Sequence, residues 1–175
     1  VAERCGVGLA LGSQRAALER GGANKHLRSL APSVPLIGNL GGVQLAASGG
    51  IDLAHRAVDD IEADALFIHL NPLQEAVQPE GETDWRGVLA AIETLVPRIG
   101  CPVIAKEVGA GISAAVARRL YDAGIHAVDV AGLGGTNWTR VEAARRKDAA
   151  LFDPFLDWGV PTVEALVSAR AACPQ

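Results

Sequence analysis

The segment His69-Leu70-Asn71-Pro72-Leu73-Gln74-Glu75 carries the densest group of side chains that could do chemistry. It follows the apolar run Ala65–Ile68 directly, and its proline ends that run and fixes a turn. A carboxylate such as Glu75 suits Mg²⁺, which often binds through one or two carboxylates together with substrate phosphate. His69 and Asn71 could donate hydrogen bonds to phosphate oxygens. The segment is either such a site or a capped strand–loop junction with solvated polar groups.

A second polar group, Gly12-Ser13-Gln14-Arg15, also follows an apolar run. The Ser13 hydroxyl could donate to a phosphate or to a flavin. The planar guanidinium of Arg15 is suited to gripping a diphosphate. The alternative interpretation is that Ser13 caps a helix over Gln14–Arg20.

Lys106 ends the apolar run Pro102–Ala105, and a lysine at the end of a buried strand needs an anionic partner. That partner could be Glu107, in a structural ion pair, or a cofactor. Neighbouring strand residues point to opposite faces, so we expect Glu107 to lie outside the pocket of Lys106. The following Gly109-Ala110-Gly111 would let a ligand approach the backbone closely.

Two glycine-rich segments also contain candidate site residues. Asn39 precedes Gly41-Gly42 and could bond a ring carbonyl or simply cap a turn. The segment 131–136, with sequence Ala-Gly-Leu-Gly-Gly-Thr, could cradle a phosphate through its N–H groups and the Thr136 hydroxyl. Glycine also serves ordinary tight turns, so this pattern alone does not decide between the two.

The elements that position these residues alternate between strand and helix. Continuous apolar runs, typical of strands buried in a parallel sheet, occur at Val7–Leu11, Pro35–Gly38, Ala65–Ile68, Pro102–Ala105 and Ala127–Val130. Helical spacing predicts helices over Asp52–Glu62, Asp84–Val96 (with Asp84 as N-cap), Ser113–Ala123 and Thr162–Ala172. Residues 78–82 and 147–158 are predicted to be loops. The alternation indicates a parallel α/β fold.

Polar residues follow all of these strands, whereas an open doubly wound sheet usually concentrates its ligand groups at one switch point. This favours a parallel (β/α)₈ TIM barrel, of which the single domain 1–175 would supply about five strands. An incomplete barrel would leave two apolar edges unpaired. The absence of Met, and an opening that reads as a helix end at Gly6, also predict an internal fragment.

Composition narrows the function further. The net charge of −4 and a pI of about 5.5, without a long basic run, argue against nucleic-acid binding. No apolar stretch reaches the ~18 residues of a membrane span. The three cysteines lie far apart, which favours a reducing cytoplasm over disulfides or a zinc site.

In this order along nearly the whole chain, the motifs resemble the central portion of the type 2, FMN-dependent isopentenyl-diphosphate delta-isomerase family. The resemblance rests on Gly12–Leu18, Asn39–Gly41, His69–Glu75 with Gln78–Gly81, Lys106–Gly109 with Gly111–Ser113, and Asp129–Trp138. The family fold is an FMN-binding (β/α)₈ barrel. Its first strand and its last glycine motifs have no counterpart here.

The resemblance implies a role for each matched residue. FMN contacts would come from Ser13, Asn39, Lys106 and Thr136. Contacts to a small diphosphate substrate would come from Ser13, Gln14, Arg15, His69, Asn71, Gln74 and Ser113. Gln74 would be the catalytic position facing the reacting hydrocarbon, and Glu75 would bind Mg²⁺.

The implied reaction, a step of isoprenoid biosynthesis, is a 1,3-proton shift from isopentenyl to dimethylallyl diphosphate. The Gln74 amide does not titrate usefully, so we expect reduced FMN to carry the proton, with Lys106 stabilising the anionic reduced flavin. NADPH would only reduce the flavin, and the full-length protein would be a homo-oligomer. The alternatives are an FMN-dependent 2-hydroxy-acid oxidoreductase of the same barrel group and a catalytically inactive fragment.

Overall fold

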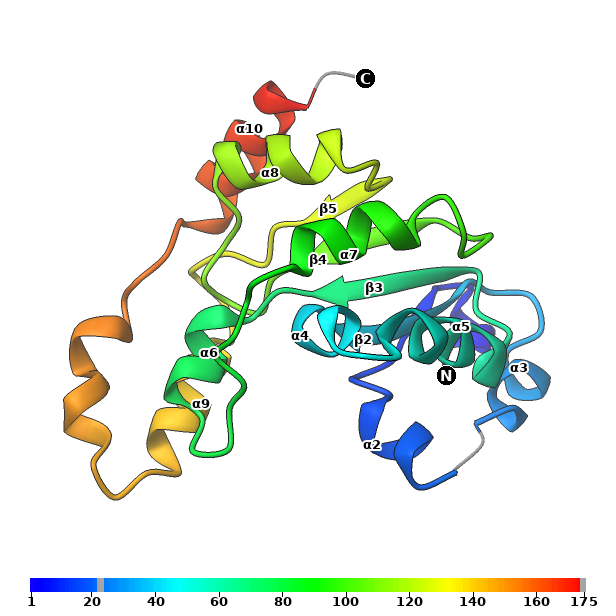
Figure 1. Ribbon diagram of the computed structural model, residues 1–175, viewed down its shortest axis with the longest axis horizontal. Helices are drawn as coiled ribbons and strands as arrows, with labels where there is room; N and C mark the ends of the chain where they lie inside the picture. Colours follow the sequence, from blue (N-terminus) through cyan, green and yellow to red (C-terminus); the bar gives the residue numbers. More distant parts are fainter. Residues whose placement is uncertain (22–23, 174–175) are drawn as a thin grey trace.

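The computed structural model describes residues 1–21 and 24–173. Five parallel strands form one sheet in the order β1-β2-β3-β4-β5 (Figure 1). The strands are β1 (Leu9–Ala10), β2 (Leu36–Gly41), β3 (Ala65–His69), β4 (Val103–Lys106) and β5 (Ala127–Asp129). The order follows the sequence and never reverses, so the sheet has no switch point of the doubly wound kind. The prediction of a parallel α/β fold is confirmed by this five-stranded parallel sheet.

Short helices and one 3₁₀ helix connect and cover the strands. They are α1 (Ala2–Cys5), α2 (Arg15–Glu19), α3 (His26–Leu30), α4 (Gly42–Ala46), α5 (Gly50–Ile61), α6 (Pro72–Val77), α7 (Val88–Leu95), α8 (Ala114–Asp122), α9 (Trp138–Ala144), η1 (Ala149–Phe155) and α10 (Thr162–Ala172). Figure 1 shows α6 and α9 together beyond the arrowhead of β3, and the two helices are in contact. None of the helices in the described part of the chain is long and apolar enough to cross a membrane.

The main core lies between the sheet and the helices α5, α7 and α8. Leu66 and Ile68 of β3 are fully buried there, as are Ile92 and Leu95 of α7. Complete burial of such side chains contributes roughly 2 kcal/mol each. This apolar layer fixes the strand ends that carry the polar residues.

Several element boundaries differ from those expected. β2 continues to Gly41, so Asn39 lies inside the strand and not after it, whereas β1 is only Leu9–Ala10. The helix predicted from Asp84 begins at Val88, after Gly87 with φ of +77°. The Asp84 carboxylate does not cap it but bonds the side chain and N–H of Arg86.

Five short helical segments were not expected. They are α3, α4, α6, α9 and η1, the last lying inside the predicted loop 147–158. Each is too short to show a helical repeat of apolar residues. The helix end expected at Gly6 is present, with that glycine in the left-handed conformation after α1.

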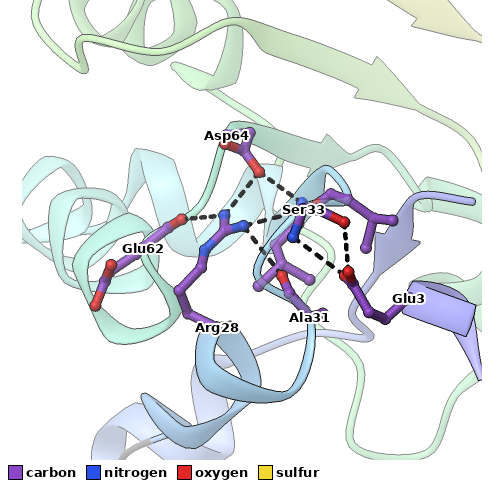
Figure 2. A network of polar contacts seen from close by, with 8 residues as sticks. Glu3, Arg28, Ala31, Ser33, Glu62 and Asp64 are labelled. Atoms are coloured by element: carbon purple, nitrogen blue, oxygen red, sulfur yellow. Dashed lines mark hydrogen bonds and ion pairs between the residues drawn. The ribbon is translucent and has the colours of Figure 1, made fainter. Parts of the chain in front are cut away.

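A polar network fixes the chain at the opposite end of the sheet, where β2 and β3 begin (Figure 2). Arg28 donates to the Asp64 carboxylate at 2.7 Å and to the Glu62 carbonyl at 2.6 Å. Asp64 also accepts the N–H of Leu36, the first residue of β2, at 2.7 Å. Hydrogen bonding to Arg28 and then to Leu36 lowers the pKa of Asp64, so the carboxylate stays charged at neutral pH. The network therefore links the chain just before β3 to the first residue of β2.

Candidate active site

Most of the polar residues predicted from the sequence meet in one cavity of about 440 Å³ at the carboxyl ends of the strands. The parallel register explains how they meet, because Gly41 pairs with His69 and His69 pairs with Lys106. The last residues of three neighbouring strands therefore lie side by side. The predicted site residues that line this cavity are Ser13, Arg15, Asn39, His69, Asn71, Gln74, Glu75 and Lys106.

His69 and Asn39 are bonded to each other inside this cavity. The Asn39 amide donates to the Leu11 carbonyl at 2.9 Å, so its oxygen must accept from His69 Nδ1 at 2.8 Å. Burial, and then the nearby charge of Lys106, lowers the pKa of His69 to about 4. His69 is therefore neutral at physiological pH. Its single N–H is already used, so Nε2 is an acceptor and not the phosphate donor that the sequence suggested.

Gln14 does not line the cavity. Its side chain is buried, with Nε2 donating to the Ala57 carbonyl at 3.0 Å and Oε1 accepting the N–H of Asn39 at 2.8 Å. The amide thus joins α5 to β2 and holds Asn39 in place. The structure places Gln14 behind the site, where it can position Asn39 but does not face a bound substrate.

Asn71, Gln74 and Glu75 are arranged at the start of α6. The Asn71 amide donates to Gln74 Oε1 at 3.1 Å and to Glu75 Oε1 at 2.9 Å. Glu75 Oε2 accepts the N–H of Glu82 at 2.8 Å. Within residues 1–21 and 24–173 there is no group of three His, Cys, Asp or Glu side chains that could hold a metal ion. A cation at Glu75 would therefore need most of its ligands from substrate and water.

Lys106 and Glu107 do not form an ion pair. The Lys106 ammonium donates to the main-chain carbonyl of Glu107 at 2.8 Å, while the Glu107 carboxylate accepts backbone N–H groups of the loop that follows. As expected from strand geometry, the two residues line different cavities. Burial lowers the pKa of Lys106, and the neighbouring charges of Asp129 and Glu107 oppose that shift.

Glu107 has a role that sequence reasoning missed. One carboxylate oxygen accepts the successive N–H groups of residues 108–111, at 2.7, 2.8, 2.6 and 3.3 Å. The backbone forms a nest of the kind that binds anions, and the protein's own carboxylate fills it. Burial raises the pKa of Glu107, and these four N–H bonds oppose the shift. The signal in the sequence was a glutamate directly before Gly109-Ala110-Gly111.

Ser113 and Thr136 lie outside the strand-end cavity. The Ser113 hydroxyl caps α8 by accepting the N–H of Val116 at 3.4 Å, and the residue lines the other cavity. Thr136 is exposed after a loop in which Gly132 packs tightly, since a Cβ there would lie 2.5 Å from the Val160 carbonyl. By contrast, Ser13 lines the strand-end cavity and does not cap α2, whose N-cap is Gln14.

The second cavity, of about 620 Å³, lies between α7 and α8. Its lining is mostly apolar and includes Leu89, Ile92, Val116 and Trp158. Apart from Ser113, it contains no residue predicted to bind substrate. The polar cavity at the strand ends is therefore the better candidate for a site that handles a charged ligand.

Comparison with known proteins gives close relatives but no matching family model. The chain is 58% identical to an isopentenyl-diphosphate delta-isomerase of Stutzerimonas stutzeri, covering 99% of this chain and 52% of that protein. It is 55% identical to the protein of the same name from Pseudescherichia vulneris, over 97% of this chain and 50% of that protein. A Synechocystis protein of that name is 51% identical, over 95% of this chain and 49% of its own length. The chain thus spans about half the length of these curated relatives.

These names correct one expectation from the sequence. The relatives are called isopentenyl-diphosphate delta-isomerase with neither a type nor a flavin in the name, and each is matched over only about half its length. The expectation of a type 2 enzyme was therefore wrong, and the similarity supports the isomerase name alone.

Similarity to solved structures is weak. A BexX/CysO complex of Amycolatopsis orientalis matches with a TM-score of 0.41 and 19% identity, over 85% of this chain and 47% of that one. A mandelate oxidase with (S)-2-phenylpropionate matches with a TM-score of 0.39 and 18% identity, over 83% of this chain and 36% of that one. Such scores do not establish a common fold.

The state of His69 can be tested by NMR titration of its ring. We expect it to stay neutral down to about pH 5, because its pKa is lowered to about 4. The unfolded chain binds this proton more readily, so the free energy of unfolding should fall as the pH drops from about 6.5 towards 4. Lys106→Met should raise the pKa of His69 by removing a neighbouring positive charge. Titration of His69 near 6.5 in both proteins would contradict the geometry described above.

The role of Glu107 can be tested by urea denaturation. Glu107→Ala should lower the free energy of unfolding by about 3 kcal/mol, because buried N–H groups lose their acceptor. Glu107→Gln keeps an acceptor oxygen, so its free energy of unfolding should fall by less. The control is Glu93→Ala, which removes an exposed carboxylate from α7 and should change the value by no more than about 0.5 kcal/mol. Equal effects of Glu107→Ala and Glu93→Ala would rule out the nest as a stabilising feature.

Proposed function

We propose that the protein interconverts isopentenyl diphosphate and dimethylallyl diphosphate by a flavin-assisted 1,3-proton shift. The observation that carries the proposal is identity of up to 58% along nearly the whole chain to proteins named for this isomerisation. The polar strand-end cavity supports it, since Arg15, Asn71, Glu75 and Lys106 line one space. These residue types suit a charged diphosphate better than a neutral substrate.

The charges around the cavity favour a substrate that arrives with a cation. Arg15 and Lys106 are the positive side chains of the lining, and Glu75, Glu80 and Glu82 are the negative ones. A diphosphate would add negative charge to a lining that already carries more carboxylates than cations. We therefore propose that Mg²⁺ binds between Glu75 and the diphosphate and offsets this repulsion.

We also propose that an anionic cofactor binds in the same cavity, next to Lys106. Within the described residues no carboxylate lies within 4.0 Å of the Lys106 ammonium, so this half-buried cation lacks an ion-pair partner. We propose that Lys106 and Asn39 hold FMN, with Ser13 of the same cavity as a further contact. When bound and reduced, FMN would supply the group that donates and accepts the proton.

The chain's own residues would bind and orient the substrate. Gln74 does not titrate usefully, so its amide would orient the hydrocarbon and not exchange its proton. His69 is neutral and offers an acceptor nitrogen, and in that state it could take a hydrogen bond from a hydrated or protonated diphosphate. Arg15 and Asn71 would hold the diphosphate end. Trp138, on the cavity wall, would limit the access of water.

We further propose that these five strands belong to a closed (β/α)₈ barrel in the full-length protein. In the described residues β1 and β5 each pair on one side only, which leaves two edges where further strands could add. Reduction of the flavin by NADPH and assembly into a homo-oligomer remain predictions. Light scattering of the full-length protein would check the second.

The test is an isomerase assay of the full-length protein with isopentenyl diphosphate, FMN, Mg²⁺ and a reductant. Dimethylallyl diphosphate should form only when all are present. Glu75→Gln should raise the Mg²⁺ concentration needed for half-maximal rate by at least about tenfold, the effect of losing roughly 1.4 kcal/mol of binding. FMN binding, followed by flavin fluorescence, should be unchanged by this substitution.

The matched control is Glu80→Gln, at a carboxylate of the same cavity that is already paired with Arg145 at 3.1 Å. It should change the Mg²⁺ requirement less than about twofold, because that charge is already neutralised. Oxidation of a 2-hydroxy acid without any isomerisation would overturn the proposed function. An identical Mg²⁺ requirement in wild type and Glu75→Gln would remove Glu75 as the metal ligand.

A further inference from the structure

Arg15, the residue best suited to grip a diphosphate, is already bonded to a carboxylate of the same cavity. Its Nη1 donates to Glu82 Oε1 at 2.9 Å, and both side chains are a little under half exposed, at 41% and 45%. Glu19 is a second, more distant neighbour, with 3.7 Å between its oxygen and Arg15 Nε. A bidentate grip on a diphosphate uses two parallel N–H bonds. The Glu82 carboxylate occupies one of the donors that such a grip needs.

Glu82 is held in this position from two further strand ends. Its other oxygen, Oε2, accepts from Gln44 Nε2 at 2.7 Å, and Gln44 lies in α4 after β2. Its N–H donates to Glu75 Oε2 at 2.8 Å, and Glu75 lies in α6 after β3. The segment before it packs closely on α6, since a Cβ at Gly81 would lie 1.9 Å from the Glu75 carbonyl. The carboxylate is therefore placed by the fold and is not a freely moving surface group.

We propose that Glu82 is an internal competitor of the substrate diphosphate for Arg15. The carboxylate keeps the guanidinium oriented towards the cavity, and an entering diphosphate must displace it or accept a negative neighbour. Glu82 then weakens binding of every anion at this site, and only ligands with several charges overcome it. This sets affinity and selectivity by repulsion as well as attraction. The inference rests on the proposed diphosphate site.

The size of the effect follows from the exposure of the pair. Partly exposed ion pairs contribute little, because water and salt screen them. Removing the Glu82 charge should therefore strengthen diphosphate binding by about two- to fivefold, and fivefold corresponds to about 1 kcal/mol. Glutamine at this position keeps the side-chain shape and can still accept the hydrogen bond from Gln44.

The experiment is isothermal titration calorimetry of the full-length protein with inorganic pyrophosphate and Mg²⁺. Glu82→Gln is compared with wild type and with Glu19→Gln. The control removes the same charge from the other carboxylate near Arg15, which is exposed and does not line the cavity. The Kd of Glu82→Gln should fall two- to fivefold, and that of Glu19→Gln should change by less than about 1.5-fold.

Steady-state kinetics with isopentenyl diphosphate provide a second readout, in which Glu82→Gln should lower KM and leave kcat within about twofold. An unchanged or raised Kd in Glu82→Gln, while wild type binds pyrophosphate, would overturn the inference and leave the diphosphate site intact. Equal strengthening by both substitutions would overturn it too, because it would show only a general effect of net charge. If wild type binds no pyrophosphate, the diphosphate site itself fails, and the inference fails with it.

Discussion

The parallel pairing of β2, β3 and β4 is the constraint on which the candidate site depends. It sets Gly41, His69 and Lys106 in one row at the carboxyl ends of the strands. A shift of register by one residue would turn every side chain of a strand to the other face. The buried residues on these strands, such as Leu66, Ile68 and Val103, make such a shift costly. The apolar core beneath the sheet therefore determines where this row of strand ends lies.

Behind this row, buried polar groups hold the side chains of the candidate site in fixed orientations. Gln14 holds Asn39, and Asn39 fixes the tautomer of His69 through its amide oxygen. Glu107 gathers four N–H groups of the loop after β4 and so fixes the backbone next to Lys106. Buried networks of this kind stabilise a structure only when each group is satisfied. Here they make the geometry of the cavity a property of the fold and not of the ligand.

The sequence predicted the main features because these depend on local patterns. Continuous apolar runs predicted all five parallel strands, and polar residues after each run predicted where a site would lie. The roles of Gln14 and Glu107 could not be predicted in the same way. Their partners are a carbonyl 43 residues away for Gln14 and a run of neighbouring N–H groups for Glu107, and only the fold brings these into position.

The prediction that Asp84 caps the following helix was wrong for a related reason. The Asp84 carboxylate accepts hydrogen bonds from the nearby Arg86 instead. Likewise, residue types alone suggested that His69 donates to phosphate. Its donor is instead used by Asn39, which becomes visible only when two strands are paired. Side-chain roles that depend on contacts between elements were thus the hardest to predict.

We propose that the diphosphate binds in the polar cavity at the strand ends and not in the apolar cavity between α7 and α8. A crystal structure of the full-length protein with Mg²⁺ and isopentenyl diphosphate would test it most directly. We expect the diphosphate oxygens on Arg15 and Asn71 and the cation on Glu75. A diphosphate bound instead beside Ser113 and Arg119, in the other cavity, would contradict this account.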